Sequence, residues 1–167
     1  FSHDDIERAT PTVVEAIELA AREGHHIDVY VTEARPRYLG RRTARTLAAV
    51  DRVDTTLVVD GAAGHYLDEC DRVVLGMSAI VDDTLYNRVG TFPIAATAAE
   101  LAVPVSAVGA SEKLIEEGFV FENEFRSPAE VMREPAEGFS VANPAYDATP
   151  THLLDGVVTE AGTEKLE

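Results

Sequence analysis

Short apolar runs alternate along the chain with longer segments that have a helical period. Five runs are rich in β-branched residues and bounded by turn residues: 27–31, 56–60, 72–77, 103–108 and 156–160. Runs of this length and composition are typical of parallel strands that helices cover on both faces. We therefore predict five largely buried strands.

Three segments between these runs carry helical patterns. In residues 10–24 apolar side chains recur with a helical period, and Thr12 and Glu15 have the spacing of a capping box. Two further helices are predicted within 41–49 and 91–101. The alternation predicts an α/β fold with a Rossmann-like, open, mainly parallel sheet and helices on both faces. Such sheets bind ligands beyond the carboxyl ends of their strands.

We expect residues 1–167 to form a single Rossmann-like domain, because the apolar content of 46% is enough for one core. The segment 118–150 has the weakest pattern, and we predict an irregular arm there. The chain begins at Phe1 and not at Met, so we interpret it as part of a longer polypeptide.

The charge pattern narrows the range of partners. The formal net charge is −16, and only two of the 14 cations are lysines, Lys113 and Lys165. This composition is typical of halophilic acidic proteins. At roughly 1 M salt, ions screen the net charge, so it attracts partners only weakly. One short arginine cluster is not a basic face, so we do not expect nucleic acid as a partner. No apolar run has the length of a membrane span, so no membrane partner is expected either.

Cys70 is the one cysteine of the chain, which excludes an internal disulfide and suits a cytoplasmic location. Its acidic neighbours raise the pKa of a thiol, so we interpret it as inert. The five histidines have no metal-ligand spacing, so no metal site is predicted. Neither a dinucleotide fingerprint nor a Walker loop is present, so no cofactor is expected.

Two segments after predicted strands offer anion-binding groups. In 86–92, Asn87 and Arg88 carry donors, Gly90 allows a turn, and Thr91 begins a predicted helix whose free N–H groups would suit a phosphate. Lys113 follows the strand at 103–108. It has two equally open interpretations: a ligand-binding cation at the carboxyl end of a strand, or an ion-pair partner of Glu112 or Glu116.

Several ordered segments resemble the C-terminal domain of the translation initiation factor 2B alpha/beta/delta family. They are 31–40 (VTEARPRYLG), 58–80, 86–98 (YNRVGTFPIAATA), 124–131 (EFRSPAEV) and 143–162 (NPAYDATPTHLLDGVVTEAG). The family also contains isomerases of methylthioribose 1-phosphate and ribose 1,5-bisphosphate. The resemblance covers nearly the whole chain and implies a C-terminal domain of a longer protein.

The resemblance also identifies positions with family roles. Asp4 falls at the position of the catalytic cysteine of the isomerases, Ser78 at that of their catalytic aspartate, and Leu39 at that of a substrate-binding glutamine. The phosphate-binding Asn-Lys pair of the family corresponds to Asn87-Arg88. On this basis we expect ligand binding, without catalysis, by Arg35, Ser78, Asn87, Arg88, Gly90, Thr91 and Lys113.

Arg35 belongs to the Arg-Pro loop of the family, at the mouth of the site. We expect it to pair with Glu33 or to face a bound anion. The arginines of the following helix, among them Arg41, are expected to pair with surface acids.

Asp4, Ser78 and Leu39 stand where the isomerases have two catalytic residues and one substrate-binding residue. These replacements lead us to expect a regulatory, non-catalytic domain that binds a sugar phosphate or a nucleotide phosphate and serves translation initiation. The alternative is an aldose–ketose sugar-phosphate isomerase with altered chemistry. A third interpretation is a sensing module attached to another catalytic domain. From the resemblance we also expect a homodimer, or pairing with a paralogous subunit, close to residues 60–67.

Overall fold

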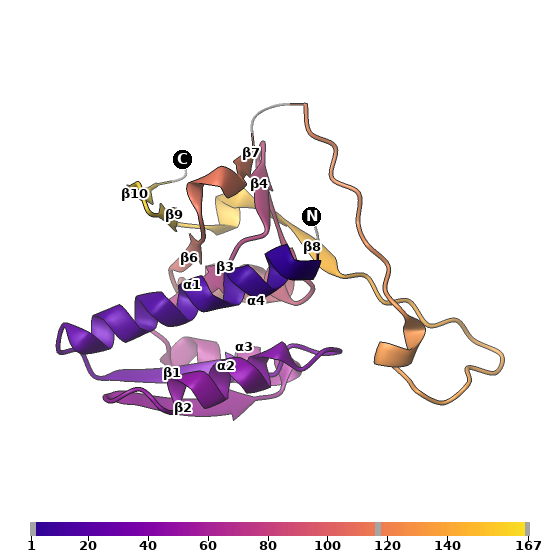
Figure 1. The fold of residues 1–167 in the computed structure, drawn as a ribbon, viewed down its shortest axis with the longest axis horizontal. Helices are drawn as coiled ribbons and strands as arrows, with labels where there is room; N and C mark the ends of the chain where they lie inside the picture. The colour runs from indigo at the N-terminus through magenta and orange to yellow at the C-terminus, as the bar shows by residue number, and fades with distance from the viewer. Residues whose placement is uncertain (1–2, 116–117, 166–167) are drawn as a thin grey trace.

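The computed structural model describes the backbone of residues 3–115 and 118–165, and within these ranges the side chains from residue 13 onward. Its strands form three hydrogen-bonded sheets (Figure 1). The first sheet pairs β1 (Ile27–Thr32) with β2 (Val53–Val58) in parallel. Because the two strands are parallel, their carboxyl ends lie at the same edge of this sheet.

The second sheet has the order β10-β9-β6-β3. Its parallel members are β3 (Val73–Gly76), β6 (Val105–Val108) and β9 (Gly156–Thr159), and β10 (Gly162–Glu164) is added antiparallel at the edge. All four residues of β6 are buried, as expected of a central parallel strand.

The third sheet has the order β7-β4-β5-β8 and is mixed. A tight antiparallel hairpin joins β4 (Ala79–Val81) to β5 (Thr84–Arg88), directly after β3. The remaining strands are β7 (Leu114–Ile115), parallel to β4, and β8 (Tyr146–Pro150), antiparallel to β5. This pairing brings residues 146–150, which are far along the chain, next to the predicted phosphate-binding segment.

The helices pack against two apolar cores. One core surrounds the buried Leu47 and lies among α1 (His3–Arg22), α2 (Leu39–Leu47), β1 and β2. The other lies under α4 (Thr91–Glu100) and includes the buried Met77, Leu85 and Val105. Short helical segments fill the connections: α3 (Ala63–Tyr66), η1 (Asp60–Ala62), η2 (Leu67–Glu69), η3 (Ser111–Lys113), η4 (Pro128–Glu130) and η5 (Thr151–Leu153).

The predicted α/β class is confirmed, as are four of the five strands within one or two residues at either end. The strand predicted at 56–60 is displaced: β2 runs from Val53 to Val58, and Asp60, the last predicted residue, begins η1. The start of the first helix is also wrong: α1 begins at His3, so Thr12 lies inside it and is not a cap.

Residues 118–145 form a long, largely irregular excursion, as the weak pattern of 118–150 predicts, but the last five residues of that predicted arm form strand β8. Apart from η4 it has no helix, and it extends away from the sheets before returning at β8 (orange in Figure 1). We call this segment the arm. No helix in the described part of the chain is both long enough and apolar enough to cross a membrane.

Candidate functional site

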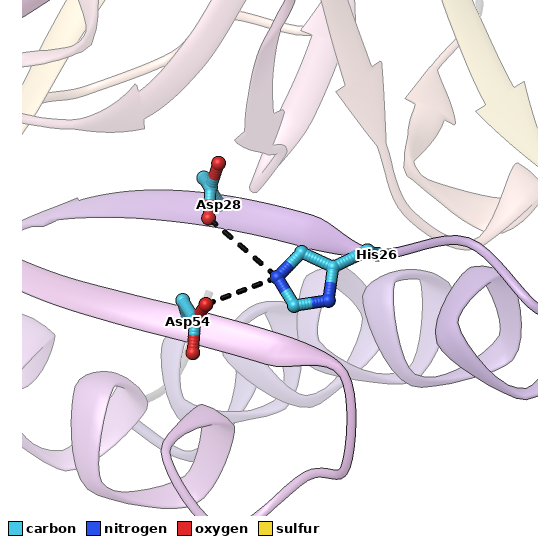
Figure 2. A group of neighbouring side chains, drawn as sticks. All are labelled: His26, Asp28 and Asp54. Atoms are coloured by element: carbon cyan, nitrogen blue, oxygen red, sulfur yellow. Dashed lines mark hydrogen bonds and ion pairs between the residues drawn. The ribbon is translucent and has the colours of Figure 1, made fainter.

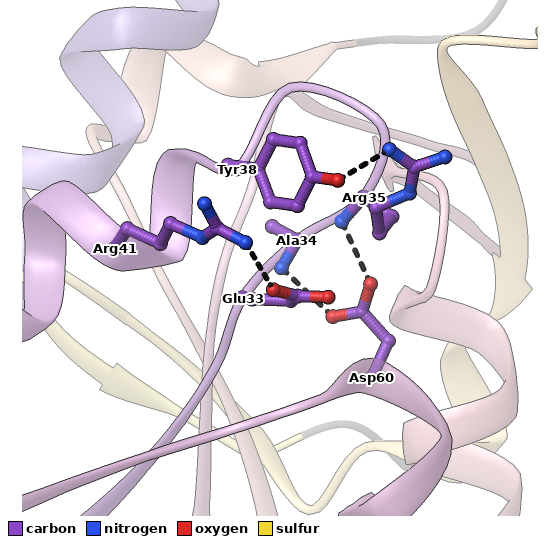
Figure 3. Close-up of polar contacts among 6 residues, drawn as sticks. All are labelled: Glu33, Ala34, Arg35, Tyr38, Arg41 and Asp60. Atoms are coloured by element: carbon purple, nitrogen blue, oxygen red, sulfur yellow. Dashed lines mark hydrogen bonds and ion pairs between the residues drawn. The ribbon is translucent and has the colours of Figure 1, made fainter. Parts of the chain in front are cut away.

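The Arg-Pro loop, residues 33–40, connects the carboxyl end of β1 to α2. The Asp60 carboxylate, which directly follows β2, accepts hydrogen bonds from the backbone N–H of Ala34 at 2.8 Å and of Arg35 at 2.7 Å (Figure 3). At Gly40 the loop passes so close to β1 that an added Cβ would lie 1.7 Å from the carbonyl oxygen of Thr32. The loop is therefore fixed to both parallel strands by its backbone.

The arginines of this loop have different partners from those expected. Arg41, and not Arg35, forms the ion pair with Glu33, at 3.0 Å, and its guanidinium lies over the Tyr38 ring (Figure 3). Arg35 donates to the Tyr38 hydroxyl at 2.6 Å and to the carbonyl oxygen of Val131 in the arm at 3.0 Å. Glu33 thus pairs with Arg41, at the start of α2, in place of the expected Arg35, while the other expectation, that Arg35 faces a bound anion, stays a prediction. The expectation that helix arginines pair with acids is confirmed at Arg41.

Three of the predicted site residues form a buried chain of hydrogen bonds. Ser78 donates to the Asn87 side-chain oxygen at 3.4 Å, and the Asn87 amide donates to Thr91 Oγ1 at 3.1 Å. Thr91 in turn donates to the carbonyl oxygen of Arg88 at 2.6 Å. All three side chains are buried, so the chain fixes the turn that carries Arg88.

The start of helix α4 differs from the prediction of free N–H groups. Gly90 has a φ of 105°, a left-handed conformation that glycine adopts readily. Its N–H donates to the Asp147 carboxylate at 2.7 Å, and the N–H of Phe92 donates to the same oxygen at 3.1 Å. The expectation that these groups are free is wrong, because the pairing of β5 with β8 places Asp147 opposite Asn87. A side-chain carboxylate already occupies the positive end of this helix.

Lys113, in η3, reaches back to the end of β3. Its ammonium donates to the carbonyl oxygen of Met77 at 3.0 Å. Met77 directly precedes Ser78, so the structure brings Lys113 close to the start of the buried chain. Glu116, one of the two acids expected as an ion-pair partner of Lys113, lies outside the described residues.

Arg35 and Arg88 line one shallow hollow, between the Arg-Pro loop and the arm. We call it the arginine hollow. Arg37 and Leu39 also line it, and the arm side contributes Arg126, Glu130 and Asn143. Four of the residues that line this hollow are arginines, the side chain that pairs best with phosphate oxygens, in a protein with a net charge of −16.

The arm side of the hollow is held by its own network. Arg126 is only 10% exposed and lies 3.3 Å from Glu124 and 4.0 Å from Glu130. The buried Asn143 amide donates to Glu130 at 2.9 Å and to the carbonyl oxygen of Ser127 at 3.0 Å. These arm residues were not among the predicted site residues. The signal available was their position in the segments 124–131 and 143–162, which carry the family resemblance.

A second polar group lies at the opposite, amino ends of β1 and β2 (Figure 2). His26 Nε2 is 3.0 Å from Asp54 and 3.9 Å from Asp28, and their ligand atoms all lie within 4.8 Å of one another. The sequence analysis missed this group because only the parallel pairing of β1 with β2 brings it together. All three side chains are exposed, and mutual ion pairing accounts for the arrangement.

Cys70 is half-buried and donates to the carbonyl oxygen of Tyr66 at 3.3 Å. Burial raises the pKa of its thiol, and the charges of Glu69, Asp71 and Asp68 raise it further. A raised pKa keeps the thiol protonated near neutral pH, which supports the interpretation of Cys70 as inert.

The structure thus divides the predicted site residues into two connected sets. Ser78, Asn87 and Thr91 form the buried chain, beside Gly90 and Lys113, and Arg88 connects this chain to the arginine hollow that it shares with Arg35. Asp4 lies on helix α1, and its side chain is outside the part that the structure describes.

Comparison with known proteins places the chain in a family. The profile of the Initiation factor 2 subunit family matches residues 7–165. The ribose 1,5-bisphosphate isomerase of Haloterrigena turkmenica is 37% identical over 162 residues, which are 87% of this chain and 49% of that protein. The chain therefore spans about half the length of this relative.

Two solved structures have the same fold. A 5-methylthioribose 1-phosphate isomerase from Pyrococcus horikoshii superposes with a TM-score of 0.83 at 27% identity, over 92% of this chain and 46% of the other. The delta subunit of translation initiation factor 2B from A. fulgidus superposes with a TM-score of 0.81 at 26% identity, over 90% and 47%. Both superpositions support the predicted fold class and the predicted resemblance.

The comparisons correct the functional expectation. Relatives from several organisms are named ribose 1,5-bisphosphate or methylthioribose-1-phosphate isomerases, with identities from 33% to 38%. The expectation of a regulatory, non-catalytic domain is wrong in the light of these names, and the inclination against an enzyme has no support. The residues Leu39 and Ser78 led to the non-catalytic expectation, but they leave the cationic side chains of Arg35 and Arg88 at the hollow unchanged.

Proposed function

Because the chain belongs to the Initiation factor 2 subunit family, we propose that it forms the phosphate-binding half of a sugar-phosphate isomerase. The reaction would convert a phosphorylated aldose into the corresponding ketose. The proposed substrate is ribose 1,5-bisphosphate, because relatives of that name are 34–38% identical to this chain, against 32–33% for the methylthioribose-1-phosphate isomerases.

The arginine hollow is the observation that carries this proposal. It lies at the carboxyl end of β1, between the loop after that strand and the arm, where open α/β sheets bind ligands. A phosphate ester carries about −1.5 to −2 charges at pH 7, and arginine offers it paired N–H donors in a fixed geometry.

The buried chain has a positioning role in this proposal. A serine hydroxyl stays neutral near pH 7, so Ser78 is not assigned the part of a base. Its hydrogen bond instead orients Asn87, and through Thr91 fixes the turn that presents Arg88. Lys113 supplies a cation next to Ser78, where negative charge on a sugar oxygen would be stabilised.

Aldose–ketose isomerisation also needs a group that transfers a proton. We assign this role to Asp4, which the resemblance places at the position of the catalytic cysteine of the family, since a carboxylate can accept and return a proton. The assignment rests on sequence position, and its test is separate from that of phosphate binding.

The test uses the full-length protein with ribose 1,5-bisphosphate, and NMR detection of the ketose product. We expect turnover in the wild type, a fall in kcat/KM of roughly 10- to 100-fold in Arg88→Gln, and loss of kcat in Asp4→Asn. Arg133→Gln, an exposed arm residue that does not line the hollow, is the matched control and should leave the rate unchanged. Absence of turnover with both ribose 1,5-bisphosphate and methylthioribose 1-phosphate would refute the proposal.

Pairing with a second copy or a paralogous subunit also remains our proposal. Close to residues 60–67, Leu57 and Val59 on and after β2 are 45% and 60% exposed, and Tyr66 stacks on Tyr30 at 4.6 Å. Exposed apolar side chains next to one another favour burial in an interface. Light scattering should give the mass of two chains for the wild type, and of one chain for Val59→Glu.

A further inference from the structure

One carboxylate faces the cations of the arginine hollow. Among the described residues that line the hollow, Arg35, Arg37, Arg88 and Arg126 are cationic and Glu130 is the one acid. An acid in this position is unexpected in a site for phosphate, because it repels the ligand that the arginines attract.

The contacts of Glu130 resemble those that a bound phosphate oxygen would make. One oxygen accepts from the Asn143 amide at 2.9 Å, and the other lies 4.0 Å from a guanidinium nitrogen of Arg126. Asn143 is buried and Arg126 is 10% exposed, whereas the Glu130 side chain is 32% exposed. The carboxylate is therefore the most accessible member of the group, and its two donors are shielded from solvent.

A purely structural role, in which Glu130 holds the arm closed, is the main alternative. The arm has other closing contacts that do not use this side chain. Ala145 N–H donates to the carbonyl oxygen of Glu124 at 2.8 Å, Arg126 N–H donates to that of Asn143 at 2.9 Å, and the Asn143 amide also holds Ser127. Closure of the arm does not depend on the negative charge at position 130.

We infer that Glu130 sets the phosphate affinity of the arginine hollow by acting as an internal competitor for Asn143 and Arg126. A phosphate oxygen that enters the hollow displaces the carboxylate from these donors, and part of the binding energy is spent on that displacement. The inference rests on the proposed function for the identity of the ligand as a sugar phosphate. It extends that proposal by naming the residue that weakens binding.

The test compares the wild-type full chain with Glu130→Gln, which keeps an acceptor oxygen for Asn143 and removes the charge. The probes are inorganic phosphate and ribose 5-phosphate, titrated by calorimetry at one fixed salt concentration. We expect Glu130→Gln to bind both probes roughly tenfold more tightly, because a like charge is removed within a few ångströms of the ligand. In the isomerase assay the same change should lower KM.

Glu124→Gln is the matched control. Glu124 pairs with Arg126 more closely than Glu130 does, at 3.3 Å, but it does not line the hollow and its side chain is 48% exposed. It should change the affinity by less than about twofold, because solvent screens it from the ligand. Equal tightening in both variants, or no tightening in Glu130→Gln, would overturn the inference.

A measurement on the wild type protects the test against a variant that does not fold. On addition of saturating phosphate, the side-chain carboxyl carbon of Glu130 should shift in the NMR spectrum more than that of Glu124. An unmoved Glu130 signal contradicts displacement. If phosphate binds and Glu130→Gln tightens it while no ketose is formed from any sugar phosphate, the proposed function fails and the internal competitor stands.

Discussion

The two sides of the arginine hollow carry similar charges on very different supports. On the body side, the Arg-Pro loop is bonded to Asp60, packed onto β1 at Gly40, and continues into α2 over a buried core. On the arm side, Arg126 and Asn143 depend on a few hydrogen bonds within a segment that has almost no regular structure.

The arm is nevertheless attached to the body at both of its ends. Phe121 stacks on Tyr86 of β5 at 3.9 Å, and the Asn123 side chain bonds to the backbone of Tyr146 at the start of β8. Between these attachments, Arg35 bonds the carbonyl oxygen of Val131. The difference suggests a division of tasks: the body side fixes the position of the hollow, and the arm side can open or adjust with little effect on the fold.

The largest effect should come from breaking the body side at Gly40. In Gly40→Ala the new Cβ would meet the backbone of Thr32 at 1.7 Å, so the loop must move away from β1. We expect a loss of about 3 kcal/mol or more in the free energy of unfolding, measured by denaturant titration. Gly61→Ala is the control, because nothing lies within 4 Å of its Cβ position. A small effect at Gly40 would show that the loop is less fixed than described.

A second change tests the turn that presents Arg88. Asp147→Ala removes the acceptor of the N–H groups of Gly90 and Phe92, and we expect a loss of roughly 2 kcal/mol in thermal or denaturant unfolding. Asp147→Asn keeps one acceptor oxygen and should lose about half as much. If both variants are as stable as the wild type, the carboxylate is not the cap of α4.

Much of the body could be predicted from the sequence because its elements have simple periods. Buried strands such as β6 read as short β-branched runs, and α4 begins at the predicted Thr91. The β4–β5 hairpin could not be read in this way, since its strands are three and five residues long and merge with the run before them. Its absence from the prediction concealed the partner strand β8, and with it the position of Asp147.

The site could be predicted where residues follow a predicted strand or match a family position with a known role. Arg35 follows β1, whereas Arg88 is the last residue of β5 and was identified by its match to the phosphate-binding pair of the family; both line the hollow. Arg126, Glu130 and Asn143 follow no strand, and their positions depend on contacts across the arm that no local pattern encodes. The same holds for His26 and Asp54, which meet only through the register of two parallel strands.

The arm side can be weakened alone at Asn143. Asn143→Ala removes the hydrogen bonds to Ser127 and Glu130, and we expect a local loss of about 1 kcal/mol. Hydrogen exchange of the arm amides, such as that of Arg126, should accelerate about fivefold, while amides of β6 exchange as in the wild type. Equal acceleration in both places would mean that the arm and the body unfold as one unit.

The smallest effect tests how the body side holds Arg35, the residue that also contacts the arm. Tyr38→Phe removes the hydroxyl that accepts from Arg35 at 2.6 Å but keeps the ring under Arg41. Because Arg35 is exposed and keeps its bond to Val131, we expect a loss of only about 0.5 kcal/mol in the free energy of unfolding. In the variant, the Arg35 guanidinium no longer has to break its hydrogen bond to the Tyr38 hydroxyl before it binds a ligand. Phosphate affinity should therefore rise by up to about twofold in calorimetric titration. A marked loss of phosphate affinity would instead show that Tyr38 holds Arg35 in its binding orientation. The Arg-Pro loop would then orient the binding side chain as well as fix the position of the hollow.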